Sequence, residues 1–266
     1  MRIGIIGLGS IGQRHRANLL GMGVHELLCV DPAVPGYQLS VDDLWAWKPE
    51  AVLICTPPET HCDLALEAFR RGAHVFCEKP LATRPSDALA VRDAARSAGK
   101  CLAVGYQLRW QLQNCVRFHA GRSLVWNVAQ NMRQWSSQYQ KDALLEFSHE
   151  LDAALYANGP VDAVSAIEEP DGWLLKLRHV DCVSTVEIWP TSTERFRDCY
   201  DGPDCVWKFS DEQNDQAYKT EVQAFLDVCQ DKPWPRELCS GAEAAHVVKI
   251  IQAAKQSARN SEVVSL

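Results

Sequence analysis

The sequence predicts an α/β protein in two parts. Residues 1–118 are expected to form a doubly wound parallel sheet, and residues 119–266 an α+β domain with an open, mostly antiparallel sheet and flanking helices. Up to about residue 118, short apolar runs alternate with helical patterns, which is typical of a parallel sheet. Beyond about residue 120, runs that alternate apolar and polar residues follow one another, which indicates antiparallel strands. The C-terminal helices could pack back on the first part.

The chain opens with an apolar run, Arg2–Ile6, that predicts a buried strand. The motif GLGSIG (Gly7–Gly12) follows at once, and then a helical pattern. This is G-x-G-x-x-G between a strand and a helix, the context that dinucleotide binding requires. Gly7 permits the tight turn, Gly9 lets the backbone approach a pyrophosphate, and Gly12 lets the helix pack against the strand. The N–H groups at the helix start then face the phosphates. The expected cofactor-binding residues of this loop are Gly7, Gly9, Ser10, Ile11 and Gly12.

An acidic residue, Asp31, ends the second predicted strand, Glu26–Val30, 19 residues beyond Gly12. An acidic residue at about this position hydrogen-bonds the ribose 2′-hydroxyl of NAD. A carboxylate would repel the 2′-phosphate of NADP, and no arginine follows Asp31 closely. We therefore expect NAD rather than NADP, although Asp31 could instead only cap the turn at Pro32.

Further strand and helix patterns continue the parallel sheet. The predicted strands are Ala51–Cys55, Ala73–Cys77 and Cys101–Gly105, and the predicted helices are 40–47, begun by Ser40, 60–71, closed by Gly72, and 85–99. Ligands of such sheets lie beyond the carboxyl ends of the strands. The residues expected at those ends are Thr56, Pro57, Glu78, Lys79 and Tyr106.

The second part shows five runs with strand patterns. They are Leu124–Asn131, Val164–Glu168, Trp173–Val180, Cys182–Trp189 and Cys205–Phe209, and helices are expected at 216–231 and 241–258. Four tryptophans fall on what looks like the exposed sheet face: Trp126, Trp173, Trp189 and Trp207. An aromatic face can form an oligomer interface, or it can pack on helices of the same chain.

Residues 143–157 have a helical pattern with no glycine or proline. On a helical wheel, the apolar side chains gather on one arc and the polar ones on the opposite arc. The polar arc holds Glu146, His149, Asp152 and Tyr156. It is either a solvated face or a face that carries proton-transferring groups.

Composition excludes several functional classes. The formal net charge of −7 argues against a nucleic-acid-binding protein. The eleven cysteines are odd in number and none are spaced as C-x-x-C, so we expect reduced, mostly buried thiols, a cytoplasmic protein and no metal. No apolar stretch reaches the ~18 residues of a membrane span, and no signal-peptide pattern opens the sequence.

Four segments occur in an order that resembles the Gfo/Idh/MocA oxidoreductase family. They are GLGSIGQRH (7–15), TPPETH (56–61), CEKPLA (77–82) and SHELD (148–152), and VGYQLRW (104–110) is also similar. The resemblance implies a Rossmann domain followed by an open antiparallel sheet, with the active site between them. The chain is short for the family, and region 111–142 and the strands after residue 160 look trimmed.

The resemblance also implies roles for single residues. Lys79 matches the E-K-P lysine beside the nicotinamide and the reacting oxygen, and Pro80 matches a proline that family members often hold in cis. His149 matches the helix histidine that serves as general acid and base, a role that an imidazole suits near pH 7. Asp152 matches an acidic residue with an orienting or structural role.

One departure concerns the catalytic carboxylate. Many family members carry aspartate four residues before the histidine, and here that residue is Leu145. Glu146 either completes the catalytic set of lysine, carboxylate and histidine, or the set lacks its carboxylate.

Several other residues are candidates for the site. Arg109 could bind an acidic substrate group or form an ion pair, and Trp110 could cover the site. Tyr106 is a further substrate-contact candidate. His61 could lie near the nicotinamide or pack at a helix start, and His15 is expected to be structural.

The resemblance thus implies an NAD-dependent oxidoreductase. The substrate would be a small carbohydrate-type molecule, a sugar, cyclitol or nucleotide-sugar derivative whose CH–OH carbon exchanges a hydride. The protein would be a homo-oligomer, assembled through the C-terminal sheet, without nucleic acid or membrane as partners. Two alternatives stay open: a dinucleotide-sensing regulator without turnover, and a Rossmann reductase of a non-carbohydrate substrate.

Overall fold

The computed structural model describes residues 1–115, 123–130, 132, 142–201, 206–208 and 211–266. The chain divides into two compact units: Met1–Gln107 with Asp215–Ala245, and Leu108–Asn214 with His246–Leu266. This division differs from the expected single cut after residue 118. The reason is that a C-terminal helix returns to the first unit, and the short strand after it pairs with the first sheet.

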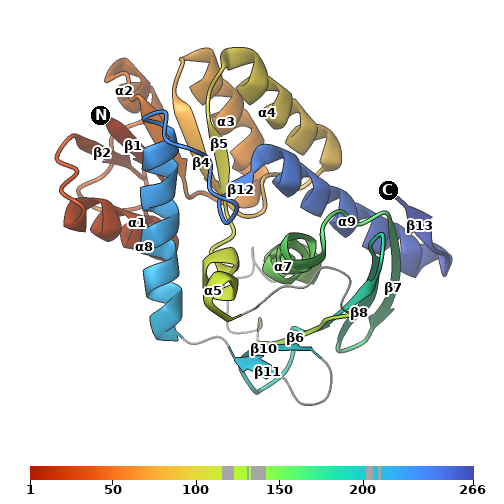
Figure 1. Cartoon of the computed structure of the whole chain (residues 1–266). Helices are drawn as coiled ribbons and strands as arrows, with labels where there is room; N and C mark the ends of the chain where they lie inside the picture. The colour runs from red at the N-terminus through yellow and green to blue at the C-terminus, as the bar shows by residue number, and fades with distance from the viewer. Residues whose placement is uncertain (116–122, 131, 133–141, 202–205, 209–210) are drawn as a thin grey trace. The chain divides into compact units, whose positions relative to one another are not determined.

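The first unit contains a six-stranded sheet in the order β12-β5-β4-β3-β1-β2 (Figure 1). Its strands are β1 (Ile3–Ile6), β2 (Leu27–Val30), β3 (Ala51–Ile54), β4 (His74–Glu78), β5 (Leu102–Gly105) and β12 (Cys239–Ser240). The first five strands are parallel, as the sequence predicts, and β12 joins β5 antiparallel. Strands β1, β3 and β5 are buried along their whole length, which explains their short, continuous apolar runs.

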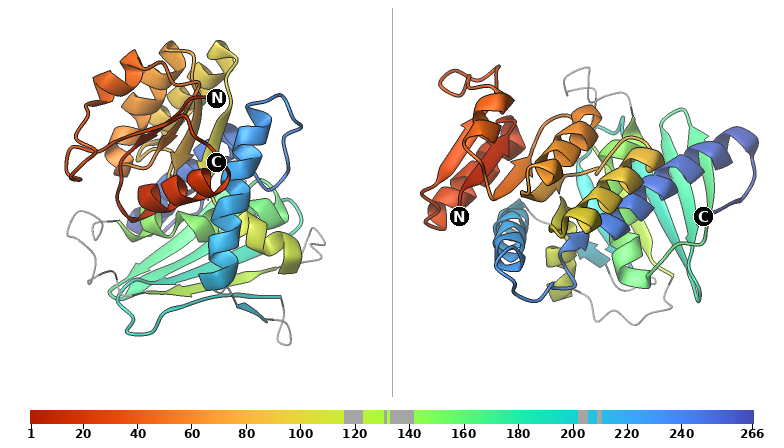
Figure 2. Two further views of the ribbon diagram at one scale, coloured as in Figure 1. Left: turned by 90° about the vertical axis from the view of Figure 1, so that its left-hand side faces the viewer. Right: turned by 90° about the horizontal axis from the view of Figure 1, so that it is seen from above.

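Helices cover both faces of this sheet (Figures 1 and 2). They are α1 (Ser10–Gly21), α2 (Val41–Ala46), α3 (His61–Arg70), α4 (Pro85–Ala98) and α8 (Asp211–Val228), with the 3₁₀ turn η1 (Pro58–Thr60) before α3. On one face, the ring of Phe76 in β4 contacts His15 of α1 and Phe225 of α8. Helices α3 and α4 pack on each other at the opposite face. Ser40 begins α2, as expected from the sequence, and forms a capping box with Asp43.

The second unit contains a seven-stranded sheet in the order β11-β10-β6-β9-β8-β7-β13. Its strands are β6 (Val125–Ala129), β7 (Ala163–Glu169), β8 (Gly172–Arg178), β9 (Val183–Trp189), β10 (Phe196–Tyr200), β11 (Val206–Lys208) and β13 (Val264–Ser265). Among the described strands of this second sheet, only the pair β6–β9 is parallel, so the prediction of a mostly antiparallel sheet is confirmed. Its helices are α5 (Leu108–Cys115), α6 (Ala143–Glu146), α7 (Ser148–Asn158) and the part of α9 (Gly241–Asn260) from His246 onward.

The strand register corrects the expectation of an exposed tryptophan face. Trp126 pairs with Val186, and Trp173 with Ile188, which places both tryptophans on the buried side of the sheet. Trp207 pairs with Cys199, which itself pairs with Trp126, so it shares that side. Of the four tryptophans, only Trp189 is on the opposite side.

Strands β10 and β13 were not predicted from the sequence. Asn131, Cys205 and Phe209, at the ends of predicted strands, lie outside the described residues.

The predicted helix 143–157 is two helices. The chain breaks at Phe147, between α6 and α7. Helix α7 is buried on all sides from Ser148 to Ala157, so the alternative of a solvated face is wrong for this helix.

Among the described residues, no helix combines the length and apolar character needed to cross a bilayer.

Candidate functional site

The three glycines of the first loop are there for different reasons. Gly7 has φ +91°, and a Cβ on it would lie 2.7 Å from the carbonyl oxygen of Cys55. A Cβ on Gly12 would lie 2.0 Å from the carbonyl oxygen of Gly7. The fold therefore requires glycine at both positions. At Gly9, by contrast, a Cβ would meet no atom within 4 Å, and the backbone φ of −62° suits any residue. Packing does not explain glycine at this position, but the close approach of a ligand would.

Helix α1 begins directly after this open glycine. Gly9 is its N-cap and supplies no side-chain hydrogen bond to the first turn. The first N–H groups of a helix have no partner within the helix. Ser10 is exposed and Ile11 half-buried, so the N–H groups of this first turn are near the surface. A helix start of this kind favours an anion.

The carboxylate of Asp31 accepts two backbone hydrogen bonds. Oδ2 accepts from the N–H of Leu8 at 2.7 Å, and Oδ1 accepts from the N–H of Ala33 at 2.8 Å. The bond from Leu8 holds the end of β2 against the glycine loop. The bond from Ala33 caps the turn at Pro32, which is the alternative role that the sequence left open for Asp31. Asp31 stays half-exposed, and a carboxylate has lone pairs for further donors, so the cap does not exclude a ribose contact.

Glu78 at the end of β4 points back into the fold. Its Oε1 accepts a 2.7 Å hydrogen bond from Nε2 of His15, and both side chains are buried. Its Oε2 accepts from the backbone N–H of Lys79 at 3.3 Å. His15 thus has the structural role expected of it. Glu78 fixes the backbone from which Lys79 extends, and Lys79 itself is half-exposed.

His61 connects two of the strand-end loops. Its Nδ1 lies 2.8 Å from the carbonyl oxygen of Pro80, and its Nε2 lies 2.8 Å from that of Thr56. The side chain is fully buried, and burial lowers the pKa of His61 while the two carbonyl contacts oppose this shift. These contacts favour the packing role over contact with the nicotinamide. The Lys79–Pro80 bond is cis, as the resemblance implied.

In the second unit, the two acidic residues of the SHELD segment form ion pairs, one fully buried and one partly buried. Asp152 accepts from Nε of Arg109 at 2.8 Å and from its Nη2 at 2.6 Å, and both side chains are fully buried. The guanidinium of Arg109 also lies over the ring of Tyr156, 5.2 Å from its centroid. The structure thus favours the ion-pair role for Arg109 over the substrate role. Glu150, equally buried, accepts from Nε of Arg197 in β10.

The remaining candidates are distributed over several elements. His149 is buried in the first turn of α7, whereas Glu146 ends α6 and is half-exposed. The break at Phe147 separates them, so they do not belong to one continuous helix, and their shared face stays a prediction. Tyr106 is buried and Trp110, in α5, is half-buried. The catalytic and substrate roles of these residues stay predictions.

Sequence reasoning missed the pair formed by Glu150 and Arg197. Glu150 stands inside the SHELD segment, but Arg197 belongs to β10, a strand that was not predicted. The one signal in the sequence is a second acidic residue in a segment rich in alanine and leucine, because a charged side chain that becomes buried needs a partner.

Comparisons with known proteins agree with this fold. Residues 24–106 match a family model described as an oxidoreductase family with an NAD-binding Rossmann fold, GFO_IDH_MocA. D-glucoside 3-dehydrogenase of Escherichia coli is 42% identical over 69 residues, which are 26% of this chain and 20% of that protein. Inositol 2-dehydrogenase of Cereibacter sphaeroides is 30% identical over 175 residues, 57% of this chain and 52% of that protein. This chain thus matches about half, or less, of the length of these two curated relatives.

A solved structure is similar over the whole chain. The WlbA dehydrogenase of Bordetella pertussis, in complex with NADH and UDP-GlcNAcA, has a TM-score of 0.80 and 19% identity, and the alignment covers 100% of this chain and 97% of that one. At this identity, the likeness shows the fold. Together with the family model, the curated relatives and the order of the sequence motifs, it leads to one conclusion: residues 24–106 carry the NAD-binding Rossmann fold of the Gfo/Idh/MocA oxidoreductases, and the chain as a whole is similar to this family.

Proposed function

We propose that the chain is an NAD-dependent oxidoreductase that transfers a hydride between the nicotinamide and a carbinol or carbonyl carbon of a sugar, cyclitol or nucleotide-sugar derivative. The open space at Gly9, directly before the uncapped start of α1, is the observation that carries this proposal. A glycine that packing does not require, at the start of a helix, suits the close approach of a pyrophosphate.

The residues of the first loop fit a dinucleotide. The first turn of α1 would hold the pyrophosphate, and the half-exposed Asp31 carboxylate would accept a hydrogen bond from the ribose 2′-hydroxyl. The same negative charge opposes a 2′-phosphate, which supports NAD over NADP. When bound, the nicotinamide supplies the hydride acceptor or donor.

Two side chains of the chain itself would handle the reacting oxygen. The ammonium of Lys79 donates a hydrogen bond to it and stabilises the negative charge that develops there. His149 takes the hydroxyl proton at an imidazole nitrogen during oxidation and returns it during reduction. Glu146 would tune this proton transfer. Glu78 and His61 act through position, since their contacts fix the backbone on both sides of Lys79 and Pro80.

The substrate class rests on the relatives. Their names specify a glucoside, an inositol and a nucleotide-linked sugar acid, all of which present secondary hydroxyl groups. Because Asp152 already engages Arg109, we do not assign Arg109 to an anionic group of the substrate.

Matched glycine variants test the cofactor site. Gly9→Ala should leave the melting temperature of the protein without cofactor nearly unchanged, because the added Cβ meets nothing. It should remove most of the stabilisation by NADH, which is about 2.7 kcal/mol at a concentration of 100 Kd in the unchanged protein. Gly12→Ala should instead lower the melting temperature without cofactor, because its Cβ collides with the Gly7 carbonyl. Undiminished NADH stabilisation in Gly9→Ala would contradict the site.

Nicotinamide absorbance tests turnover. The protein is mixed with NAD⁺ or NADH and a panel of cyclitols, sugars, amino sugars, nucleotide sugars and their keto forms. We expect at least one substrate, with turnover abolished in Lys79→Ala and retained in the control Lys176→Ala, whose exposed side chain is in β8. NADH binding without turnover across the panel would favour the sensing protein instead.

Association with a second copy of the chain is part of the proposal. The outer face of the second sheet exposes Ile167, Val183 and Val206, by 54%, 38% and 41%. Lys176 and Glu187 share this face, so apolar contacts and both signs of charge are present for self-complementary pairing. Light scattering should give a mass above one chain, reduced to one chain in the double variant Ile167→Lys with Val183→Lys. A monomeric unchanged protein would refute this assembly.

We also place the protein in the cytoplasm. Cys29, Cys55 and Cys77 are buried as thiols in strands or strand ends of the first sheet, which suits a compartment that keeps thiols reduced. Cell fractionation tests this, and recovery from an oxidising compartment would contradict it.

A further inference from the structure

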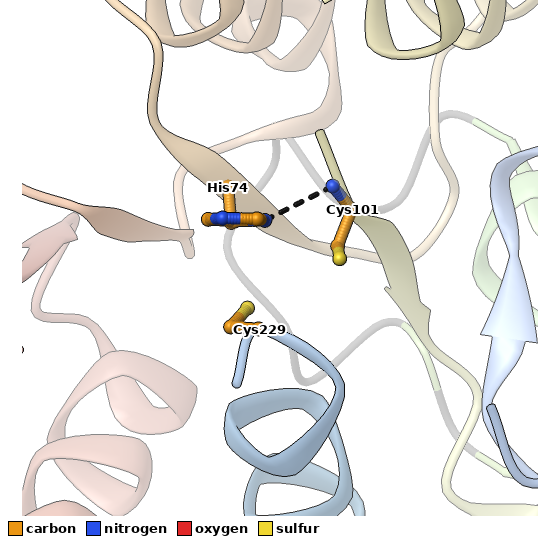
Figure 3. Close-up of side chains that lie close together, drawn as sticks. All are labelled: His74, Cys101 and Cys229. Atoms are coloured by element: carbon orange, nitrogen blue, oxygen red, sulfur yellow. Dashed lines mark hydrogen bonds between the residues drawn. The ribbon is translucent and has the colours of Figure 1, made fainter. Parts of the chain in front are cut away.

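One imidazole and two thiols meet in the first unit: His74, Cys101 and Cys229 (Figure 3). One ligand atom from each residue, a ring nitrogen or a sulfur, lies within 4.8 Å of the other two. All three side chains are half-buried, so an ion from solvent can reach them. Residues of these three types are the usual protein ligands of zinc.

The fold brings the three residues together from distant parts of the sequence. Strands β4 and β5 pair in parallel with Val75 beside Leu102, which places His74 and Cys101 side by side one position earlier. The backbone N–H of Cys101 donates to Nδ1 of His74 at 3.1 Å and so orients the ring. Cys229 directly follows α8, and the thiol of Cys101 donates to the carbonyl oxygen of Val228 at 3.8 Å.

The cluster is remote from the proposed cofactor loop. His74 begins β4 and Cys101 directly precedes β5, so both lie at the amino-end edge of the parallel sheet. The glycine loop, Asp31 and Lys79 follow the carboxyl ends of β1, β2 and β4. A ligand at the cluster would therefore serve the fold of this unit, and hydride transfer would not involve it.

We propose that His74, Cys101 and Cys229 bind a thiophilic divalent cation, with Zn²⁺ as the natural choice and water as the fourth ligand. Two thiolates and an imidazole favour zinc over magnesium or calcium, which prefer oxygen. Zn–S bonds of about 2.3 Å and Zn–N bonds of about 2.0 Å put tetrahedral ligand atoms about 3.5–3.8 Å apart. The present separations of up to 4.8 Å would have to close by at most about 1.3 Å to reach the tetrahedral distances.

Ion binding has two local costs and one structural consequence. Ligation through Nδ1 of His74 replaces its hydrogen bond from the Cys101 N–H. Cys101 and Cys229 would each bind as a thiolate, so the hydrogen bond from the Cys101 thiol to the Val228 carbonyl is lost as well. The structural consequence is a cross-link: the ion joins β4 and β5 to the end of α8, a helix that belongs to this unit although it comes late in the sequence. Phe225 of α8 already packs on Phe76 of β4, so the ion would strengthen a packing contact that exists without it.

Cobalt substitution tests the site in the full-length reduced protein. Co²⁺ added without oxygen should produce thiolate-to-cobalt charge-transfer absorption and the intense visible bands of tetrahedral cobalt. The signal should saturate at one equivalent, and Zn²⁺ should displace it. Cys229→Ser and His74→Ala should lower the charge-transfer intensity and weaken Co²⁺ binding at least tenfold. Cys62→Ser is the matched control, because Cys62 is also half-exposed in this unit and its thiol contacts a backbone carbonyl, that of Asp87.

The outcomes are distinct. The site is supported by a saturating cobalt spectrum that depends on His74 and Cys229 but not on Cys62. Zn²⁺ should then raise the melting temperature of the unchanged protein and of Cys62→Ser, but not that of His74→Ala or Cys229→Ser. Absence of thiolate-to-cobalt absorption overturns it. So does a spectrum that all variants share, because the ion would then bind elsewhere. A Cys101–Cys229 disulfide in mass spectra of reduced protein re-exposed to air, without cobalt binding beforehand, would assign the pair to redox chemistry and refute the metal site.

Discussion

Replacing Asp152 by asparagine should be among the most damaging single changes in the second unit. The guanidinium of Arg109 is fully buried and contacts Asp152 through two nitrogen atoms, at 2.8 and 2.6 Å. The substitution leaves a buried positive charge without this carboxylate, and breaking a buried pair in this way costs about 3–5 kcal/mol. For a chain of this size, that loss lowers the melting temperature by about 6–20 °C.

The assay is thermal and urea unfolding of the unchanged protein and three variants. Asp162→Asn is the matched control, since its 2.6 Å pair with Arg178 has the same chemistry but is more than half exposed on both sides. An exposed pair contributes about 0–1 kcal/mol. Arg109→Met combined with Asp152→Leu removes both charges, and should recover most of the lost stability. If Asp152→Asn destabilises the protein no more than Asp162→Asn does, the assignment of a structural, buried pair is refuted.

Three further predictions concern other parts of the chain. Burial is the main cause that lowers the pKa of His61, His179 and His246, so the unfolded chain protonates first as the pH falls. The free energy of unfolding, measured by urea titration, should stay constant above the ordinary histidine pKa of about 6.5. Below that pH it should fall by up to about 1.4 kcal/mol per pH unit for each of these histidines, and a constant free energy down to pH 5 would contradict this. Ser40→Ala, which removes the capping box of α2, should cost about 1 kcal/mol in urea unfolding, whereas no change would mean that the cap is not formed. Asp31→Ser should narrow the difference between NADH and NADPH in melting-temperature shifts, and equal shifts in the unchanged protein would refute its role in selectivity.

The parallel sheet could be predicted because its signal is local. A buried parallel strand is a short apolar run, and each run is separated from the next by a helical pattern, so β1 and β3–β5 are found within a residue or two. The capping box at Ser40 is equally local. By contrast, the sequence could only leave open that a C-terminal helix packs back on the first unit, because the return of α8 depends on contacts between distant residues, such as Phe225 with Phe76.

The helix break at Phe147 was missed for a physical reason. Nothing in the segment around it disfavours a helix, since it contains no glycine or proline. The amphipathic wheel then failed because α7 is buried on every side, and its polar residues are paired inside the protein instead of facing water. Asp152 and Glu150 have arginine partners, Arg109 and Arg197, far away in sequence.

The cluster of His74, Cys101 and Cys229 shows the same limit. Parallel pairing of β4 with β5 could have placed His74 beside Cys101 from the sequence alone, because the two residues lie at the starts of the predicted strands Ala73–Cys77 and Cys101–Gly105. Cys229 could not have been added, since its place depends on where α8 packs. An expectation of no metal that rests on C-x-x-C spacing covers only ligands that are close in sequence.

Some residues of the glycine loop and of α7 are required by the fold, whereas others have no structural explanation and suit a ligand. Gly7 and Gly12 are fixed by backbone contacts, whereas Gly9 has no such constraint. In α7, the buried pair of Asp152 with Arg109 and the partly buried pair of Glu150 with Arg197 hold a helix that apolar residues of similar volume could also hold, since buried pairs rarely stabilise more than such residues do. If His149 transfers the proton, as proposed above, its orientation depends on how these pairs hold α7. The double variant of Arg109 and Asp152 is then expected to remain folded and yet lose turnover, and full turnover in the folded double variant would contradict this dependence.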